Sequence, residues 1–178
     1  QHIQKSLDLD NGRSISLWPH GVLFRDSEAG MRRRMIKEDL VECVIGLGPN
    51  LFYNSPMEAC LLITKTSKTA DKKGKILFIN AVNEVKQQSS MGYLESKHID
   101  NIFKAYKDFE NKKHLSALVD STDVLSNKGN MTISLYVQPQ KYSESTLSFE
   151  DEFSLWDESN ESMKATMNNL FQTLENQQ

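Results

Sequence analysis

The fold is decided by Val41–Leu47 (VECVIGL), which is followed by two similar runs, Ala59–Thr64 (ACLLIT) and Lys75–Asn80 (KILFIN). Apolar runs of this length between polar loops predict strands that are buried in a sheet. An earlier run, Ser14–Trp18 (SISLW), stops at Pro19 and predicts another buried strand. We therefore expect at least four strands in one open sheet.

A helix is expected between the Ser14–Trp18 strand and the strand that begins at Val41. Asp26 or Ser27 can cap this helix, and its apolar side extends to about Leu40. A strand, a helix and a strand in this order imply a right-handed crossover and a parallel pair. The next connection is too short for a helical crossover, so the third strand should return antiparallel. These elements predict the α/β class.

The pattern changes after residue 80, where shorter elements are expected. They are a helix over Glu95–Phe109, a small sheet with Leu118–Val119, a helical turn at Val124–Leu125, a strand over Asn130–Val137 and a final helix from about Glu158. We divide the chain accordingly into residues 1–81 (α/β domain), 82–140 (an α+β extension of that domain) and 141–178 (an acidic linker and the C-terminal helix).

The chain has 178 residues and a formal net charge of −3. This charge produces no overall positive field, so any contact with DNA needs a local patch or another subunit. Cys43 and Cys60 lie within apolar runs, which favours reduced thiols in a cytoplasmic protein. The histidines lack the spacing of metal ligands, and no apolar run is long enough for a membrane helix. Because the sequence begins with Gln1 rather than Met, we expect a piece of a longer protein.

Four segments carry a resemblance to a known family. In order, they are Trp18–Arg25 (WPHGVLFR) with the following Met31–Arg34 (MRRR), Val44–Tyr53 (VIGLGPNLFY), Lys73–Ala81 (KGKILFINA) and Asn130–Val137 (NMTISLYV). Each segment alone is a weak signal, but four in this order make a specific match over roughly residues 1–140. On these residues the chain resembles the C-terminal half of the modification subunits of type I restriction–modification systems.

The resemblance implies half of a Rossmann-like methyltransferase sheet with a small α+β extension and a C-terminal helix. Such proteins transfer a methyl group from S-adenosylmethionine to the exocyclic amine of adenine in DNA, in a complex with a specificity subunit and a restriction subunit. Their glycine-rich cofactor motif and Asn-Pro-Pro-Tyr/Phe catalytic motif precede the segment equivalent to Gln1, and neither occurs here. We therefore expect the parent to be an adenine-specific DNA methyltransferase, and this chain alone to be inactive and to bind no cofactor. The alternative is a non-catalytic interaction module derived from such a subunit.

Candidate substrate-binding residues follow two strands, at ends that we expect to share one edge of the sheet. They are Pro19, Arg25, Asn50, Phe52 and Tyr53. Ligands of open α/β sheets bind at that edge, and an aromatic ring can receive a base that is flipped out of the duplex. Phe52 is the first candidate for this ring and Tyr53 the second; alternatively, Phe52 closes the apolar end of the sheet. Arg25 is a candidate for a phosphate contact.

Other polar residues near this edge have less specific interpretations. The cations Arg32, Arg33, Arg34 and Lys37 are expected on a solvated helix face. We interpret His20 as a loop residue rather than a base, because the family pattern requires no histidine. The sequence departs from the family at Ser55–Cys60 (SPMEAC), where members usually carry Thr followed by Ile-Pro-Thr. Glu58 thus places an acid near the edge expected to face DNA, which bears on activity or substrate affinity.

The final helix carries a candidate partner-binding face. Met163, Met167, Leu170 and Leu174 follow one another at spacings of four, three and four residues. This is the a/d pattern of a coiled coil, about two heptads long and therefore too short to be stable alone. The face either packs on its own domain or contacts a helix of another chain. The resemblance favours the second interpretation, with the specificity subunit as partner.

Overall fold

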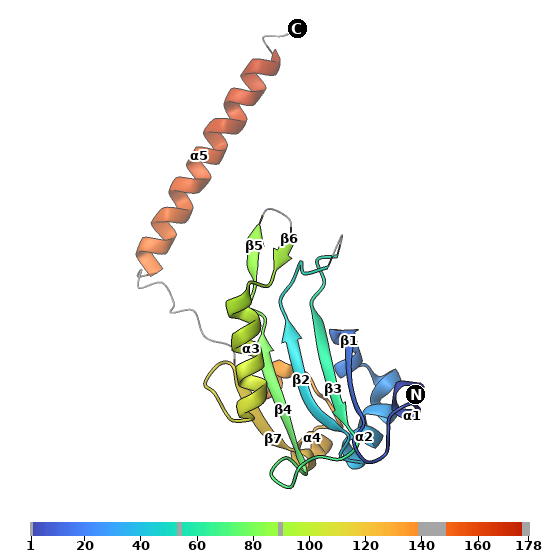
Figure 1. Cartoon of the computed structure of the whole chain (residues 1–178). Helices are drawn as coiled ribbons and strands as arrows, with labels where there is room; N and C mark the ends of the chain where they lie inside the picture. The colour runs from blue at the N-terminus through green and yellow to red at the C-terminus, as the bar shows by residue number, and fades with distance from the viewer. Residues whose placement is uncertain (1, 53–54, 89–90, 139–148, 176–178) are drawn as a thin grey trace. The chain divides into compact units, whose positions relative to one another are not determined.

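The computed structural model describes residues 2–52, 55–88, 91–138 and 149–175 (Figure 1). The chain divides into two compact units, residues 1–139 and residues 140–178. The described part of the first unit is a sheet with helices on both faces, and that of the second unit is the helix α5 (Phe149–Glu175). None of the described helices is both long enough and apolar enough to cross a membrane.

The sheet has five strands in the order β1-β3-β2-β4-β7. They are β1 (Arg13–Pro19), β2 (Val41–Leu47), β3 (Ala59–Lys65), β4 (Lys75–Ala81) and β7 (Ser116–Asp120). β3 is antiparallel to both of its neighbours, β4 is parallel to β2, and β7 is antiparallel to β4. All seven residues of the central strand β2 are buried, as its continuous apolar run predicts. The predicted α/β class and the antiparallel return of the third strand are confirmed.

β1 is an edge strand, and two predictions about it are wrong. Ile15 is 63% exposed and Leu17 is 47% exposed, so the strand is not buried. Its hydrogen-bonded neighbour is β3 and not β2, because Ile63 lies opposite Ile15 on one side and opposite Cys43 on the other. β1 and β2 still run in the same direction, as the crossover between them requires, but β3 lies between them.

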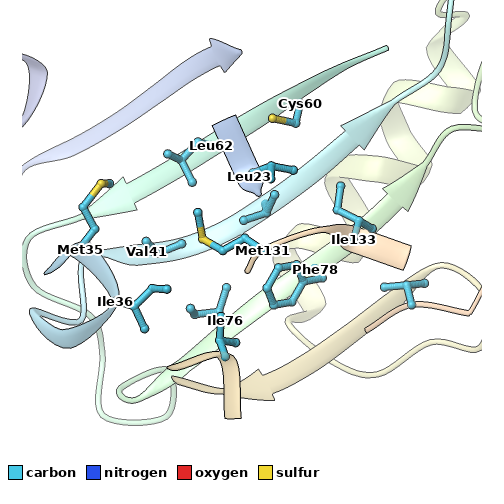
Figure 2. Packing of buried hydrophobic residues seen from close by; sticks show 13 residues of the cluster. Leu23, Met35, Ile36, Val41, Cys60, Leu62, Ile76, Phe78, Met131 and Ile133 are labelled. Carbon is cyan, nitrogen blue, oxygen red and sulfur yellow. The ribbon is translucent and has the colours of Figure 1, made fainter. Parts of the chain in front are cut away.

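Two helices pack on opposite faces of the sheet, because side chains alternate along each strand. α2 (Ala29–Lys37) contributes Ile36 to the core cluster that contains Phe78 of β4 (Figure 2). α3 (Ser96–Asp108) packs against the other cluster. This cluster contains Leu77, the residue that precedes Phe78 in the chain. The predicted helix over Glu95–Phe109 therefore forms within one residue of its expected ends.

The remaining described elements of the first unit are short. They are α1 (His2–Lys5), α4 (Ser121–Ser126), the 3-10 turns η1 (His20–Leu23), η2 (Asp26–Glu28) and η3 (Ile133–Leu135), and the hairpin of β5 (Lys86–Gln88) with β6 (Met91–Tyr93). Neither Asp26 nor Ser27 caps α2, since both lie in η2 and the N-cap position, Glu28, makes no side-chain cap hydrogen bond.

Three further predictions need correction. The predicted strand over Asn130–Val137 is not formed; Ile133–Leu135 is a 3-10 turn, and Met131, Ile133 and Val137 pack into the cluster around Phe78, whereas Leu135 is 57% exposed. The pair Leu118–Val119 belongs to β7 and so to the main sheet rather than to a small separate one. The final helix begins at Phe149, nine residues before the predicted start, because the acidic segment before Glu158 is helical as well.

Arg32 is also placed differently from the prediction. It is 2% exposed, whereas Arg33, Arg34 and Lys37 are exposed as expected for a solvated helix face. A buried guanidinium group needs hydrogen-bond acceptors, and the fold supplies them from main-chain carbonyls. Arg32 is therefore part of the core and not part of a basic surface.

Candidate functional site

A pocket of about 200 Å³ lies where β1 ends and β3 begins. Its lining residues are Leu17, Trp18, Pro19, Phe52, Ser55, Met57, Glu58 and Ala59. The antiparallel pairing places Pro19 opposite Ala59, so the end of one strand and the start of the next form adjoining walls. Phe52 and Ser55 reach the same pocket from the loop between β2 and β3. The structure thus brings two of the predicted substrate-binding residues, Pro19 and Phe52, into one pocket.

The loop that carries Phe52 is fixed through its backbone. Asn50 has a positive φ of 60°, a conformation that asparagine tolerates better than most residues. Its carbonyl accepts a hydrogen bond from the N–H of Gly92, 2.8 Å away, and the N–H of Ser55 donates to the carbonyl of Phe52 at 3.1 Å. Asn50 therefore shapes the loop, but it is not among the residues that line the pocket. Phe52 itself is half-buried.

Of the other two predicted substrate-binding residues, the structure describes Arg25, which is not among the residues that line this pocket. Arg25 is exposed, and its guanidinium lies over Gly21, where an added Cβ would come within 2.6 Å of Nε. Gly21 is thus required for this close approach of the Arg25 side chain. Tyr53 lies outside the described residues.

Several lining residues were not predicted as site residues. Trp18, which is 39% exposed, donates from Nε1 to Oγ of Ser16 at 2.8 Å, and Met57, which is exposed, lines the same pocket. The prediction paired β1 with β2, whereas the observed β1–β3 pairing places Ala59 opposite Pro19 and so brings the segment that precedes β3 to the end of β1. The sequence feature that could have indicated these lining residues is the Ser55–Cys60 segment, because it departs from the family pattern.

One polar contact lies at the rim of the pocket. Nδ1 of His20 is 3.4 Å from Oε2 of Glu58. Glu58, the acid that the sequence placed near this edge, therefore faces a histidine. The rest of the lining is mainly apolar, and within the described ranges no group of three His, Cys, Asp or Glu residues could hold a metal ion.

The predicted partner-binding residues all lie on α5. Met163 is 57% exposed and Met167 is 49% exposed. Leu170 and Leu174 are part of the same helix, and their side chains lie outside what the structure describes. Two exposed aromatic residues, Phe153 and Trp156, precede them on the helix with ring centroids 5.8 Å apart.

A comparison with models of known protein families matches this chain to one family. The family model described as N-6 DNA Methylase matches residues 1–145. The chain belongs to this family. Its curated relatives include the methylase subunits of the type I restriction enzymes MjaVIII and MjaVII of Methanocaldococcus jannaschii. These are 38% and 35% identical over 123 residues, which are 67% of this chain and 21% of each relative. The chain thus spans about a fifth of the length of these relatives.

Solved structures give the same assignment for the fold. A type I restriction-modification system methyltransferase subunit from Streptococcus thermophilus superposes with a TM-score of 0.70 at 30% identity. The match covers 75% of this chain and 28% of the other. A chain from a structure of the type I R-M system has a TM-score of 0.58 at 18% identity. That match covers 100% of this chain and 39% of the other. The predicted methyltransferase type of α/β fold and the predicted resemblance to type I modification subunits are confirmed.

Proposed function

We propose that this chain is part of a type I modification subunit that methylates the exocyclic amine of adenine in DNA with S-adenosylmethionine. The observation that carries the proposal is the family match over residues 1–145, supported by relatives that are named as type I methylase subunits. DNA and the specificity and restriction subunits are the proposed partners. A protein that modifies chromosomal DNA in a bacterium or archaeon works in the cytoplasm.

The proposed contribution of this chain is capture of the target base. A base that is methylated on its exocyclic amine must leave the duplex, and an aromatic side chain provides a surface on which it can stack. Phe52 lies in a pocket with Trp18 and Pro19, at the carboxyl ends of β1 and β2 where α/β sheets bind ligands. Arg25 and Asn50 are proposed to support this site from outside the pocket lining, and Tyr53, which lies outside the described residues, remains a proposed substrate-binding residue.

S-adenosylmethionine does not fit the residues of this pocket. The cofactor carries hydroxyl groups and a charged amino-acid end, which need several hydrogen-bonding partners. The lining of the pocket is mostly apolar, and its carboxylate, on Glu58, faces His20. We therefore assign cofactor binding and the catalytic motif to other parts of the subunit, and base capture to this one.

A second candidate function is a non-catalytic interaction module. It is favoured by α5, whose exposed residues include Trp156, Met163 and Met167, because apolar residues on an exposed helix face indicate a partner. The two functions differ in whether they require the aromatic ring of Phe52. An interaction module needs α5 and no aromatic ring in the pocket.

Substitution of Phe52 in the methyltransferase polypeptide that contains this chain tests the base-capture role. Phe52→Leu keeps an apolar side chain but removes the stacking surface, and Phe52→Tyr keeps both. We expect Phe52→Leu to lower the methylation rate by about 5- to 150-fold, since stacking contributes about 1–3 kcal/mol per base, while Phe52→Tyr stays near the wild-type rate. The fluorescence of 2-aminopurine at the target position should rise on binding wild type and Phe52→Tyr, but not on binding Phe52→Leu.

Thermal unfolding of the same variants separates this role from packing. A melting temperature near that of wild type is expected for Phe52→Leu, because Phe52 is half-buried at the end of the sheet. If Phe52→Ala instead destabilises the fold by the roughly 3–5 kcal/mol that is typical of a core phenylalanine, the ring closes the sheet and base capture is contradicted. Equal methylation by the Leu and Tyr variants would contradict it as well.

A further inference from the structure

The β5–β6 hairpin is bonded to the loop that carries Phe52. The N–H of Gly92, in β6, donates a hydrogen bond of 2.8 Å to the carbonyl of Asn50. Gln87 lies opposite Gly92 in the hairpin, and its Nε2 is 3.5 Å from the carbonyl of Pro49. The hairpin therefore contacts two consecutive residues of the loop, the second of which lies two positions before Phe52.

The hairpin is in turn anchored to the start of α3. Nζ of Lys86, in β5, lies 2.8 Å from Oε1 of Glu95, the N-cap residue of α3. Oε2 of the same carboxylate lies 2.8 Å from Nζ of Lys97, and Nδ1 of His98 accepts a hydrogen bond of 3.1 Å from the N–H of Glu95. Because α3 packs on the sheet, the hairpin gives the loop a support that is fixed to the core.

The packing at Gly92 leaves no room for a side chain. Gly92 is buried, and an added Cβ would lie 3.0 Å from the carbonyl oxygen of Pro49 and 2.9 Å from Cγ2 of Val85. Its φ is not positive, so the close approach of its neighbours, and not its backbone conformation, requires glycine here. The Pro49 oxygen belongs to the main chain, so a Cβ at this position can be accommodated only if the loop moves.

We infer that Gly92 is a positioning residue for Phe52: its N–H and its lack of a side chain fix the loop on the β5–β6 hairpin and so place the ring in the pocket. The inference rests on the proposed base-capture function. Gly92 does not line the pocket and acts only through the loop. The segment between the two residues is short, and the hydrogen bond from Ser55 to the Phe52 carbonyl closes it on the other side. A shift at Asn50 is therefore passed on to the ring.

Substitution of Gly92 should affect the turnover rate more than the binding of DNA. An error of about 1 Å in the position of a reacting group can cost about 100-fold in rate, and a Cβ at Gly92 displaces the loop by less than this. We therefore expect Gly92→Ala to lower kcat about tenfold. The KM for DNA should change by less than about twofold, because contacts with phosphates dominate DNA affinity and Gly92 is buried.

The first experiment measures the contact in the 178-residue chain without DNA. Hydrogen exchange followed by NMR should show a protected Gly92 amide in wild type. In Gly92→Ala the amide at this position should exchange about 2- to 10-fold faster, as expected for one weakened hydrogen bond. An unprotected Gly92 amide in wild type overturns the inference.

Incorporated 4-fluorophenylalanine reports on the ring of Phe52 in the same chain. The chain has eight phenylalanines, and the Phe52 resonance is the one that is absent from the spectrum of Phe52→Leu. This resonance should move in Gly92→Ala. It should stay in place in the control Gly30→Ala, because nothing lies within 4 Å of a Cβ added to Gly30. A Phe52 resonance that does not move in Gly92→Ala overturns the inference.

The second experiment measures methylation by the whole methyltransferase subunit in a double-mutant cycle. Gly92→Ala alone should lower kcat and reduce the rise in 2-aminopurine fluorescence, whereas Gly30→Ala should match wild type. In the Phe52→Leu background, Gly92→Ala should lower kcat no further, because Gly92 acts through a ring that this background lacks. A loss of stability alone does not produce this coupling. A wild-type kcat in Gly92→Ala, or losses that multiply in the double variant, overturns the inference.

A second pair of variants tests the same loop if Gly92→Ala does not fold. Asn50 has a φ of 60°, which glycine adopts freely and alanine only with strain. Asn50→Ala and Asn50→Gly both lack the amide side chain, so the difference between them reports on the backbone of the loop. Asn50→Ala should have the lower kcat of the two, and only when Phe52 is present. Equal kcat values for the two variants overturn the inference.

The two experiments separate the inference from the function on which it rests. If the Gly92 amide and the Phe52 resonance behave as expected but Phe52→Leu methylates DNA like wild type, Gly92 positions the ring and the base-capture function is wrong. If Phe52→Leu abolishes base capture but Gly92→Ala leaves both the resonance and kcat unchanged, the function stands and the role of Gly92 is wrong.

Discussion

Nε of Arg32 donates a hydrogen bond to the carbonyl of Gly129, 3.0 Å away, although 97 residues separate them in the sequence. Nη1 of the same guanidinium donates to the carbonyls of Val22 at 3.0 Å and Arg25 at 2.7 Å. Burial lowers the pKa of Arg32, and the nearby carboxylate of Glu28 opposes this effect. One side chain of α2 thus holds together the turn after β1 and the turn after α4.

Replacement of Arg32 should therefore destabilise the fold. Arg32→Met keeps an apolar stem of similar length but removes the donor to the carbonyls of Val22, Arg25 and Gly129, so we expect a loss of about 2–4 kcal/mol in the free energy of unfolding. Urea denaturation measures this loss. The matched control is Arg34→Met on the exposed side of the same helix, which should change stability by no more than about 0.5 kcal/mol. Equal stabilities of the two variants would contradict the structural role.

A buried carboxylate on the opposite face of the sheet makes a second prediction. The side chain of Glu42 is 1% exposed; it accepts a hydrogen bond from the hydroxyl of Tyr106 at 2.7 Å. Nζ of Lys72 lies 3.5 Å from Oε1 and Nη2 of Arg13 lies 3.9 Å from Oε2. Tyr106→Phe removes a hydrogen bond to a charged group, and we expect a loss of about 1.5–3 kcal/mol in stability.

A double-mutant cycle tests whether this loss comes from the contact with Glu42. Glu42→Gln in the Tyr106→Phe background should cost less than Glu42→Gln alone, because the two substitutions remove the same interaction. Burial, followed by the hydrogen bond with Glu42, raises the pKa of Tyr106. The folded state therefore keeps this proton where an unfolded tyrosine loses it, so the contribution is present below about pH 10 and is lost at higher pH. Additive effects of the two substitutions would contradict the contact.

The two thiols make the fold sensitive to alkaline pH. Burial raises the pKa of Cys60 to about 11, and burial, followed by the charge of Glu42, raises the pKa of Cys43 well above its usual value. Both thiols ionise in the unfolded chain near pH 8.5, so their contribution to stability is present below that pH and is lost as the pH rises. At pH 9.5 the contribution of each thiol should lower the free energy of unfolding by about 1.4 kcal/mol relative to neutral pH.

Urea denaturation of wild type and Cys60→Ala at pH 7.5 and pH 9.5 measures this effect. The difference in stability between the two pH values should be smaller in the variant by about 1.4 kcal/mol, whatever the cost of the substitution itself. Alkylation by iodoacetamide should also remain slow in the native protein at pH 9.5, because Cys43 and Cys60 are buried. Rapid alkylation under native conditions is the contrary result.

The strands with continuous apolar runs could be predicted from sequence, and the partners of polar residues could not. Val41–Leu47 forms as expected because every side chain of β2 is buried. The exposure of Ile15 depends on which strand lies next to β1, and the composition of β1 does not contain that information. Asn130–Val137 alternates like a strand in sequence, but Ile133–Leu135 is a turn in which Ile133 reaches the core and Leu135 is exposed.

The site was predicted in part for the same reason. Pro19 and Phe52 could be assigned to one edge of the sheet, because both follow the carboxyl ends of strands. Trp18 and Glu58 enter the pocket through the register of β1 with β3, and an antiparallel register between distant segments is set by their packing. Arg32 was assigned to a solvated face because its burial depends on tertiary packing: one of the carbonyls that bind it, that of Gly129, is 97 residues away in the sequence.

The 178-residue chain alone should not bind S-adenosylmethionine. It contains neither the glycine-rich motif nor the Asn-Pro-Pro motif of the family, and the Phe52 pocket offers mainly apolar contacts. Isothermal titration of the chain with the cofactor should give no heat of binding, while the same titration of the whole subunit should. Binding by the isolated chain in the micromolar range would contradict the assignment of the cofactor site to other parts of the subunit.

The face of α5 is longer than the sequence suggested. From Phe153 the residues Phe153, Trp156, Asn160, Met163 and Met167 follow one another at spacings of three and four, and the helix continues through Leu170 and Leu174. A helix of 27 residues extends about 40 Å, and this spacing is the a/d pattern of a coiled coil. The early start of the helix at Phe149 thus adds aromatic residues to the predicted seam.

We expect this seam to contact a helix of the specificity subunit in the proposed complex. Met163→Glu with Met167→Glu places two charges in a contact that must exclude water, which should cost several kcal/mol and abolish co-purification of the two subunits. Ala165→Glu with Gln172→Glu is the matched control, because these positions lie about half a turn from the seam and add the same charge. The control should co-purify normally.

Circular dichroism and thermal unfolding of the seam variant decide what a loss of co-purification means. A folded subunit that no longer binds its partner supports the docking face, because the charges then act only between chains. If the seam variant co-purifies as well as the control, the face belongs to the chain's own packing or to no contact at all. Failure of the seam variant to fold, with a folded control, likewise assigns Met163 and Met167 to the core of the subunit itself.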